Sequence, residues 1–220
     1  DEALQSSREP IALLERMKRE LGSSNFNAQY QQAPISQVGA LVKPHWLARF
    51  HANDITREDC VQSWDTGVKA GNHHDASACA TFVVRDGVHH LIDMLVVRHE
   101  YPELKREIIR HAARFNPSAV VIEDKASGQS LLQDLKRETD LALIPFMPNA
   151  DKVTRLLRVT PMIETGKLAL PHRASWLGAF EHELLQFPDG THDDQVDTVS
   201  QYLNWVRNCP SSDRLRIRSV

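Results

Sequence analysis

Carboxylates at three separate points of the chain have the type and spacing for metal-dependent hydrolysis. Asp65 and Glu123 each end a short apolar segment, and Asp193, Asp194 and Asp197 open the last helical segment. Hard divalent cations such as Mg²⁺ prefer oxygen ligands and are usually held by a few carboxylates while they retain water. Two such ions about 4 Å apart can activate water and stabilise the leaving oxygen in phosphodiester cleavage. One acid from each of the first two points and one or two from the third would suit that chemistry.

Each of the first two acids also has a purely structural explanation. Asp65 precedes Thr66 and Gly67 and could simply cap a turn. Glu123 could be an exposed strand end, although a carboxylate that ends a doubly buried strand is costly unless it is paired or binds metal. Asp124 would point to the opposite side of the same strand, which makes it the weaker candidate.

The acids of the last helix can be explained in part by helix capping. Asp is a favoured N-cap residue, and the helix dipole stabilises acids in the first turn. Asp193 and Asp197 share one face at a spacing of four, with Asp194 one step around the helix. Three like charges this close repel each other, and a divalent cation would offset that repulsion. The sequence leaves open which of the three binds metal, and whether His192 supports a ligand or is an exposed loop residue.

The elements that must position these acids follow from periodicity and turn signals. Three apolar segments, the last two joined by the Asp86-Gly87 turn, are followed by strands that alternate with helices. This order predicts an α/β fold with a mixed sheet covered by helices. Strands are expected at 60–64, 78–85, 88–98, 119–122, 142–146 and 167–170, and helices at 102–115, 127–138, 152–163, 174–186 and 193–206.

The two ends of the chain have weaker patterns. A helix is expected from Pro10 to Leu21, stopped by Gly22, and the stretch from there to residue 57 has no strong period. We therefore predict a linker or the end of a neighbouring domain at 1–57, the chemistry-bearing domain at 58–208, and a loose tail at 209–220.

Composition sets broad limits. The 220-residue chain has a formal net charge of -3, which neither supports nor excludes nucleic-acid binding, because a metal-binding nuclease also needs acids. Its three cysteines are far apart and form no CxxC pair, which favours reduced thiols in a cytosolic protein. No apolar run approaches the roughly 18 residues of a membrane span, so no membrane partner is expected.

Several basic residues lie close in sequence to the acids. Lys152, Arg155 and Arg158 recur at three-residue spacing in one helix. They could form a solvated face, which we slightly favour, or a strip that contacts DNA phosphates without reading sequence. Lys125 could lie near the scissile phosphate.

Several segments in combination resemble the C-terminal part of bacteriophage terminase large subunits. The order and spacing of the acid-rich segments make the resemblance specific, whereas any one segment alone would be weak. The matching segments are Ser63–Gly67 (SWDTG), Val121–Gly128 (VIEDKASG) and Phe187–Asp197 (FPDGTHDDQVD), with support from Lys167–Pro171 (KLALP) and Phe26–Pro34 (FNAQYQQAP).

The resemblance implies an RNase H-like fold with a five-stranded type of mixed sheet, three antiparallel strands and then parallel ones. Its first and fourth strands are adjacent, so Asp65 and Glu123 would lie side by side, and the last helix would bring Asp194, with Asp193 beside it. Mg²⁺ or Mn²⁺, two ions in all, would bind there. Such an enzyme cuts concatemeric double-stranded viral DNA during packaging, in the cytoplasm of an infected or lysogenic bacterium, with a small terminase subunit and the portal as partners.

One departure and two alternatives follow. The family's large subunit also has a packaging ATPase, but the sequence contains no G-x-x-x-x-G-K-[ST] motif. We therefore expect no ATPase activity from this chain. It would be a nuclease piece of the large subunit or a prophage remnant. It could instead be another RNase H-like nuclease, such as a resolvase or transposase-like enzyme. A non-catalytic DNA-binding or assembly module is the second alternative.

Overall fold

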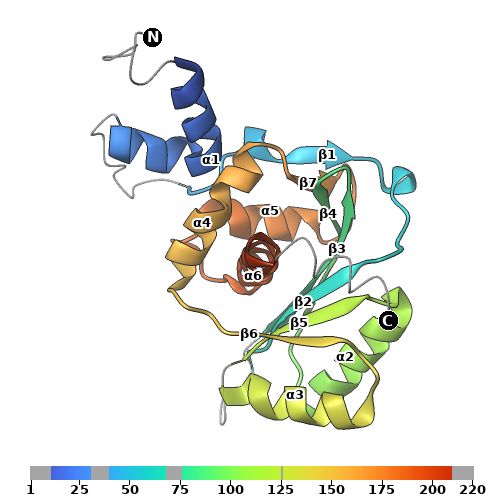
Figure 1. The fold of residues 1–220 in the computed structure, drawn as a ribbon. Coiled ribbons are helices and arrows are strands. Elements are labelled where there is room, and N and C mark those ends of the chain that lie inside the picture. The colour runs from blue at the N-terminus through green and yellow to red at the C-terminus, as the bar shows by residue number, and fades with distance from the viewer. Residues whose placement is uncertain (1–10, 31–39, 68–75, 125, 210–220) are drawn as a thin grey trace.

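The computed structural model describes residues 11–30, 40–67, 76–124 and 126–209, and Figure 1 shows the resulting α/β fold. A single seven-stranded sheet has the order β1-β7-β4-β3-β2-β5-β6. Its strands are β1 (Ala48–Phe50), β2 (Val61–Asp65), β3 (Ser77–Arg85), β4 (Val88–Val97), β5 (Ala119–Glu123), β6 (Leu143–Phe146) and β7 (Leu168–Pro171).

The central five strands have the predicted RNase H-like arrangement. β2, β3 and β4 pair antiparallel in chain order, and β5 and then β6 add in parallel on the other side of β2. The mixed sheet is therefore confirmed. The expected five-stranded size is too small, because β7 pairs in parallel with β4 and β1 pairs in parallel with β7.

β1 lies inside the stretch that we expected to be a linker. Ala48–Phe50 forms the edge strand, and Val42 and Trp46 are buried in the same core as the sheet. A three-residue strand carries too little periodicity to be recognised, since it depends on the neighbouring β7 for its hydrogen bonds. The linker therefore cannot extend to residue 57, while the rest of the proposed domain division stays a prediction.

Helices cover both faces of the sheet. Figure 1 shows α4, α5 and α6 on one face and α2 and α3 on the other, with α6 in the middle of its layer. The helices are α1 (Ile11–Tyr30), α2 (Tyr101–Phe115), α3 (Ala126–Glu138), α4 (Lys152–Glu164), α5 (Leu177–Gln186) and α6 (Asp194–Asn208), with short 3₁₀ helices at Pro44–Trp46 and Ala52–Asp54. The predicted stop at Gly22 is a kink within α1, where Gly22 has φ 76°.

Each face has its own hydrophobic core. The larger core lies between the sheet and α4–α6 and includes Phe82, Phe180 and Tyr202. The smaller lies under α2 and α3 and includes Trp64 and Ile108. Within the described residues, no helix combines the length and the apolar character that crossing a membrane requires.

Candidate metal-binding active site

Alternation along β5 aims Glu123 at the α6 face of the sheet. Ala119 and Val121 belong to the larger core, and Val120 and Ile122 belong to the smaller core. Successive side chains of a strand point to opposite faces, so Glu123 follows Val121 toward α6. Glu123 is buried, which makes a purely solvent-exposed strand end the wrong explanation for this residue.

Alternation along β2 aims Asp65 at the same face. Val61 packs in the larger core, and the Ser63 hydroxyl donates to the Thr198 carbonyl of α6 at 2.9 Å, whereas Trp64 lies in the smaller core. Asp65 follows Ser63 by two residues and therefore also faces α6.

The strand register brings the two acids together. β2 and β5 run parallel, and the last paired residues are Trp64 and Ile122. Asp65 and Glu123 each come one residue later, so both lie at the same edge of the sheet, on neighbouring strands. The proximity implied by the family resemblance is therefore present in the fold.

Buried hydrogen bonds hold α6 over these strand ends. Gln201 Nε2 donates to Ser63 Oγ at 3.0 Å and to the Trp64 carbonyl at 3.1 Å, next to Asp65. It also lies 3.4 Å from the Val121 carbonyl, two residues before Glu123. One fully buried amide thus joins α6 to both acid-bearing strands, which fixes the helix relative to them.

The acids affect each other electrostatically. Burial raises the pKa of Asp65 well above its ordinary value, and the charges of Asp197, Glu123 and Asp194 raise it further, while Lys152 lowers it. Burial also raises the pKa of Asp194 and of Asp197. The charges of Glu123 on β5 and of Asp194 and Asp197 on α6 thus all act on Asp65, and a cation beside Asp65 would offset them.

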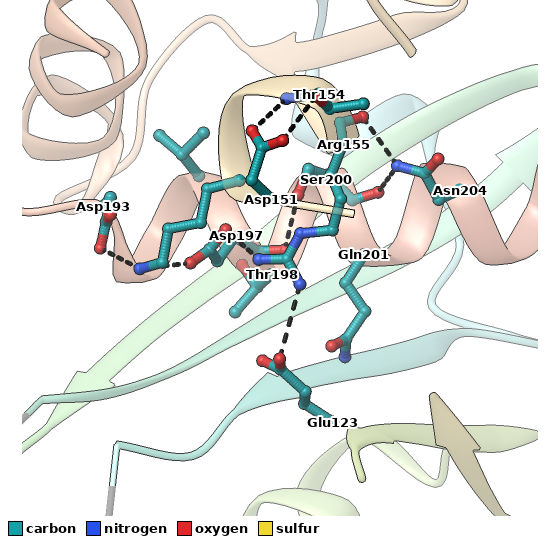
Figure 2. A network of polar contacts seen from close by, with 12 residues as sticks. Glu123, Asp151, Thr154, Arg155, Asp193, Asp197, Thr198, Ser200, Gln201 and Asn204 are labelled. Carbon is teal, nitrogen blue, oxygen red and sulfur yellow. Dashed lines mark hydrogen bonds and ion pairs between the residues drawn. The ribbon is translucent and has the colours of Figure 1, made fainter. Parts of the chain in front are cut away.

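Two basic residues of α4 contact part of this cluster (Figure 2). Arg155 lies between Asp197 and Glu123, with Nη2 2.7 Å from Asp197 Oδ1 and Nη1 3.5 Å from Glu123 Oε1. Lys152 Nζ lies 2.7 Å from Asp193 Oδ1 and 2.8 Å from Asp197 Oδ2. Asp193 and Asp197 are thus both neutralised by side chains of the protein.

Asp65 and Asp194 differ from those two acids. Both are half-buried, and within the described residues neither carboxylate makes a hydrogen bond or ion pair. With Glu123 they form an oxygen-only donor set, which fits a hard divalent cation by charge and ligand chemistry. Their present positions are not a finished site, because the described part of the chain has no three acidic, histidine or cysteine side chains in a metal-ligating arrangement.

The start of α6 is capped from another helix. Asp193 occupies the N-cap position but its side chain makes no capping bond, so that explanation of the residue is wrong. Instead the buried Glu183 of α5 accepts from the backbone N–H groups of Gln195 (2.7 Å) and Val196 (3.0 Å), and from Gln195 Nε2 (2.6 Å). Glu183 was not predicted from the sequence. Its signal would have been a carboxylate on the buried side of α5, just before the acid-rich turn.

A glycine at the start of α3 was also missed. A Cβ atom on Gly128 would lie 2.0 Å from the Glu123 carbonyl oxygen, so only glycine allows the helix to approach the end of β5 this closely. Gly128 follows Glu123 by five residues and belongs to the segment that carried the family resemblance. Its contribution is to shape the strand end, with no chemistry of its own.

The remaining candidates are less involved. Asp124 is partly buried, and its backbone N–H donates to the Phe146 carbonyl. His192 is exposed. Arg158 is exposed and donates to Asn149, whereas Arg155 is buried, so the expected solvated face does not extend to Arg155. Lys125 lies outside the described residues.

Comparisons with known proteins agree with this architecture. The model of the terminase RNaseH-like domain family matches residues 62–205. The large terminase of a thermophilic bacteriophage, in complex with ADP, superposes with a TM-score of 0.67 at 11% identity, over 94% of this chain and 59% of that chain. A second structure of the same terminase gives 0.64 at 11% identity, over 89% of this chain and 52% of that one. The chain thus spans little more than half of those proteins.

Isolated nuclease domains also match. The large terminase nuclease of the thermophilic phage G20c with bound zinc has a TM-score of 0.53 at 16% identity, over 74% of this chain and 95% of that chain. The same nuclease with bound cobalt gives 0.52 at 13%, over 77% and 98%. At these identities the superpositions establish the fold alone. The comparison with curated protein sequences found no match.

Proposed function

Because this chain belongs to the terminase RNase H-like domain family, whose model matches residues 62–205, we propose that it is a metal-dependent endonuclease that cuts concatemeric double-stranded viral DNA during genome packaging. The observation that carries the proposal is that Asp65 and Glu123 lie at adjacent strand ends, on the face that α6 covers. The charges of Glu123 and Asp194 both act on Asp65, which supports adding Asp194 to the proposed site.

The protein's own groups divide into ligands and supports. Asp65, Glu123 and Asp194 would hold the metal, and Asp193 and Asp197 would bind the basic residues of α4. When bound, a pair of Mg²⁺ or Mn²⁺ ions would activate a water molecule and stabilise the leaving oxygen of the phosphodiester. Glu183 and Gln201 would keep the start of α6, and with it Asp194, against the strand ends.

The choice of Mg²⁺ or Mn²⁺ rests on the donor set. The three proposed ligands offer only carboxylate oxygens, the donors that these ions prefer, whereas zinc sites in proteins usually include histidine or cysteine. Zinc and cobalt are the ions bound in the G20c nuclease structures. The ion pairs of Asp193 and Asp197 leave Asp194 as the α6 residue that we propose as a direct ligand.

The wider setting of the proposal follows the family. We propose double-stranded DNA as substrate, a terminase small subunit and a portal as partners, and the cytoplasm of an infected or lysogenic bacterium as the place of action. The exposed Lys152 and Arg158 of α4 would contact backbone phosphates near the acids. The expectation that this chain does not hydrolyse ATP stays a prediction, tested by phosphate release from ATP.

Plasmid cleavage tests the proposed activity. The purified chain is incubated with supercoiled DNA in Mn²⁺, Mg²⁺ or EDTA, beside Asp65→Asn, Glu123→Gln and Asp194→Asn. We expect metal-dependent nicking and linearisation that all three substitutions abolish. Asp140→Asn is the matched control, because Asp140 is exposed and lies at the opposite end of the strands, and we expect it to cut like the parent.

Two results would favour other functions. A strong preference for branched DNA over linear duplex would indicate a resolvase-like enzyme. Absence of cleavage, together with a melting temperature that Mn²⁺ does not raise, would indicate a non-catalytic module, because a ligand that binds the folded state must stabilise it.

A further inference from the structure

Arg155 occupies an unusual place for a guanidinium group. The residue is 2% exposed, and its side chain reaches from α4 to the acids of α6 and β5 (Figure 2). The α4 backbone at this point is itself held, since Asn204 of α6 donates to the Arg155 carbonyl at 2.9 Å. Arginine is suited to such a position because its planar fork can serve two carboxylates at once.

The two contacts of this guanidinium are unequal. The distance from Nη2 to Asp197 Oδ1 is 2.7 Å, which is a close ion pair, whereas 3.5 Å separates Nη1 from Glu123 Oε1. Asp197 is only 3% exposed, and its second oxygen lies 2.8 Å from Lys152 Nζ. Asp197 is therefore engaged on both oxygens, while the contact of Arg155 with Glu123 is the weaker one.

The geometry points to Arg155 as a resident counter-cation, a positive side chain that neutralises Glu123 until a metal ion replaces it. In this assignment Arg155 is a positioning residue: it keeps Glu123 near Asp65 in the metal-free protein, gives it up when metal binds, and stays fixed on Asp197. The inference rests on the proposed metal site.

The physical basis is competition for one carboxylate. A buried carboxylate needs a positive partner, so Glu123 requires compensation while no metal is present. When Glu123 leaves Arg155 to bind metal, the buried guanidinium is not left unpaired, because its ion pair with Asp197 remains. The same competition makes Arg155 reduce metal affinity, which a residue with only a packing role would not do.

Metal titration of the folded chain tests this competition directly. Mn²⁺ binding is measured by calorimetry on the parent, Arg155→Lys and Arg155→Met, with melting temperatures in EDTA. Lysine has one charged donor group, which we expect to stay with Asp197, so Arg155→Lys should bind Mn²⁺ about three- to tenfold more tightly while it melts near the parent. Arg155→Met should bind Mn²⁺ more tightly too but melt roughly 6–12 °C lower in EDTA, because a buried pair has lost its partner.

Two further variants make the test specific. Arg110→Met removes an arginine from an exposed pair with Glu107 on α2 and should leave Mn²⁺ affinity unchanged. In a Glu123→Gln background Arg155→Lys should no longer tighten Mn²⁺ binding, since the contested carboxylate is gone.

The outcomes separate this inference from the proposed function. Equal or weaker Mn²⁺ affinity in Arg155→Lys, or tightening that persists with Glu123→Gln, would overturn the role of Arg155 and leave the metal site standing. If Arg155→Met does not fold, Arg155→Lys decides alone. A folded parent chain that binds no Mn²⁺ would overturn the proposed function and this inference together.

Discussion

Two helices of equal length, α2 and α6, lie on opposite faces of the sheet and differ in the share of polar residues that they bury (Figure 1). α2 buries five of its residues, Leu104, Ile108, His111, Ala112 and Phe115. α6 buries eleven, and six of them are Gln195, Asp197, Thr198, Ser200, Gln201 and Asn204. A largely apolar stripe thus holds α2 against the sheet. In contrast, α6, which carries Asp194 and Asp197, buries polar side chains as well as apolar ones.

The difference follows from what each helix must position. Apolar contacts are non-directional, so the buried stripe of α2 covers the sheet without setting the angle of any polar group at the site. Hydrogen bonds have narrow distance and angle limits, and Gln201 and Glu183 each make several from buried sites. The polar contacts of α6 therefore fix where Asp194 lies relative to Asp65. The predictions below test this division, beginning with the largest expected effect.

A cavity under α2 should cost stability and leave the site intact. Ile108 is fully buried in the smaller core. Ile108→Ala removes apolar contacts and should lower the free energy of unfolding by about 4 kcal/mol. Urea denaturation measures this loss, and Mn²⁺ titration of the folded variant should match the parent. A clear change in Mn²⁺ affinity would show that α2 also positions the acids.

On the α2–α3 face of the sheet, Gly128 of α3 packs against the backbone of Glu123 and so contacts the proposed site. Gly128→Ala would place a Cβ atom against the Glu123 carbonyl, so the helix or the strand end must move. We expect a loss of about 3 kcal/mol and weaker Mn²⁺ binding, because Glu123 moves with its backbone. Gly178→Ala in α5 is the control, since a Cβ there meets nothing within 4 Å and should stabilise the helix slightly. Equal behaviour of the two variants would contradict the close approach.

Sequence patterns predicted most of the sheet because each pattern depends only on residues within one strand or turn. Alternation in β5 and the Asp86-Gly87 turn report on local structure, and the central strands appear where they were expected. For Glu183 and Arg155, the sequence gives a position on a helix but no signal of the partner. Their roles depend on which residues α5 and α4 meet in the folded chain, and neither spacing nor composition encodes those distances. β1 was not predicted for a related reason, since this short segment forms a strand through its pairing with β7.

His111 is the polar exception on α2, and it gives that face a pH dependence. Burial lowers the pKa of His111 to about 4, with a smaller lowering by Arg114. The unfolded chain protonates this imidazole below a pKa of about 6.5, while the folded chain resists, so stability should fall as pH drops from about 6.5 to 4. The expected loss from this group is about 2 kcal/mol between pH 7 and 5. Urea denaturation of the parent and His111→Gln across this range should show a shallower decline in the variant, and parallel curves would contradict the assignment.

Because Glu183 of α5 caps the start of α6, weakening this cap should lower stability modestly and also weaken metal binding. Glu183→Gln keeps one acceptor oxygen but loses the charge and one of the bonds to the start of α6. Because a charged acceptor stabilises a helix N-terminus, we expect a loss of about 1–2 kcal/mol. Mn²⁺ binding should weaken several-fold, since the turn that carries Asp194 is no longer held.

A nearby glutamate provides the matched control. Glu181 lies on the same helix, but it pairs with Arg49 at the surface. Glu181→Gln should change stability by less than about 1 kcal/mol and leave Mn²⁺ affinity as in the parent. If both substitutions cost stability and neither alters Mn²⁺ binding, the polar contacts of α6 would serve folding alone. If Glu183→Gln weakens Mn²⁺ binding and Glu181→Gln does not, the directional bonds from Glu183 place Asp194 accurately enough to matter for metal binding.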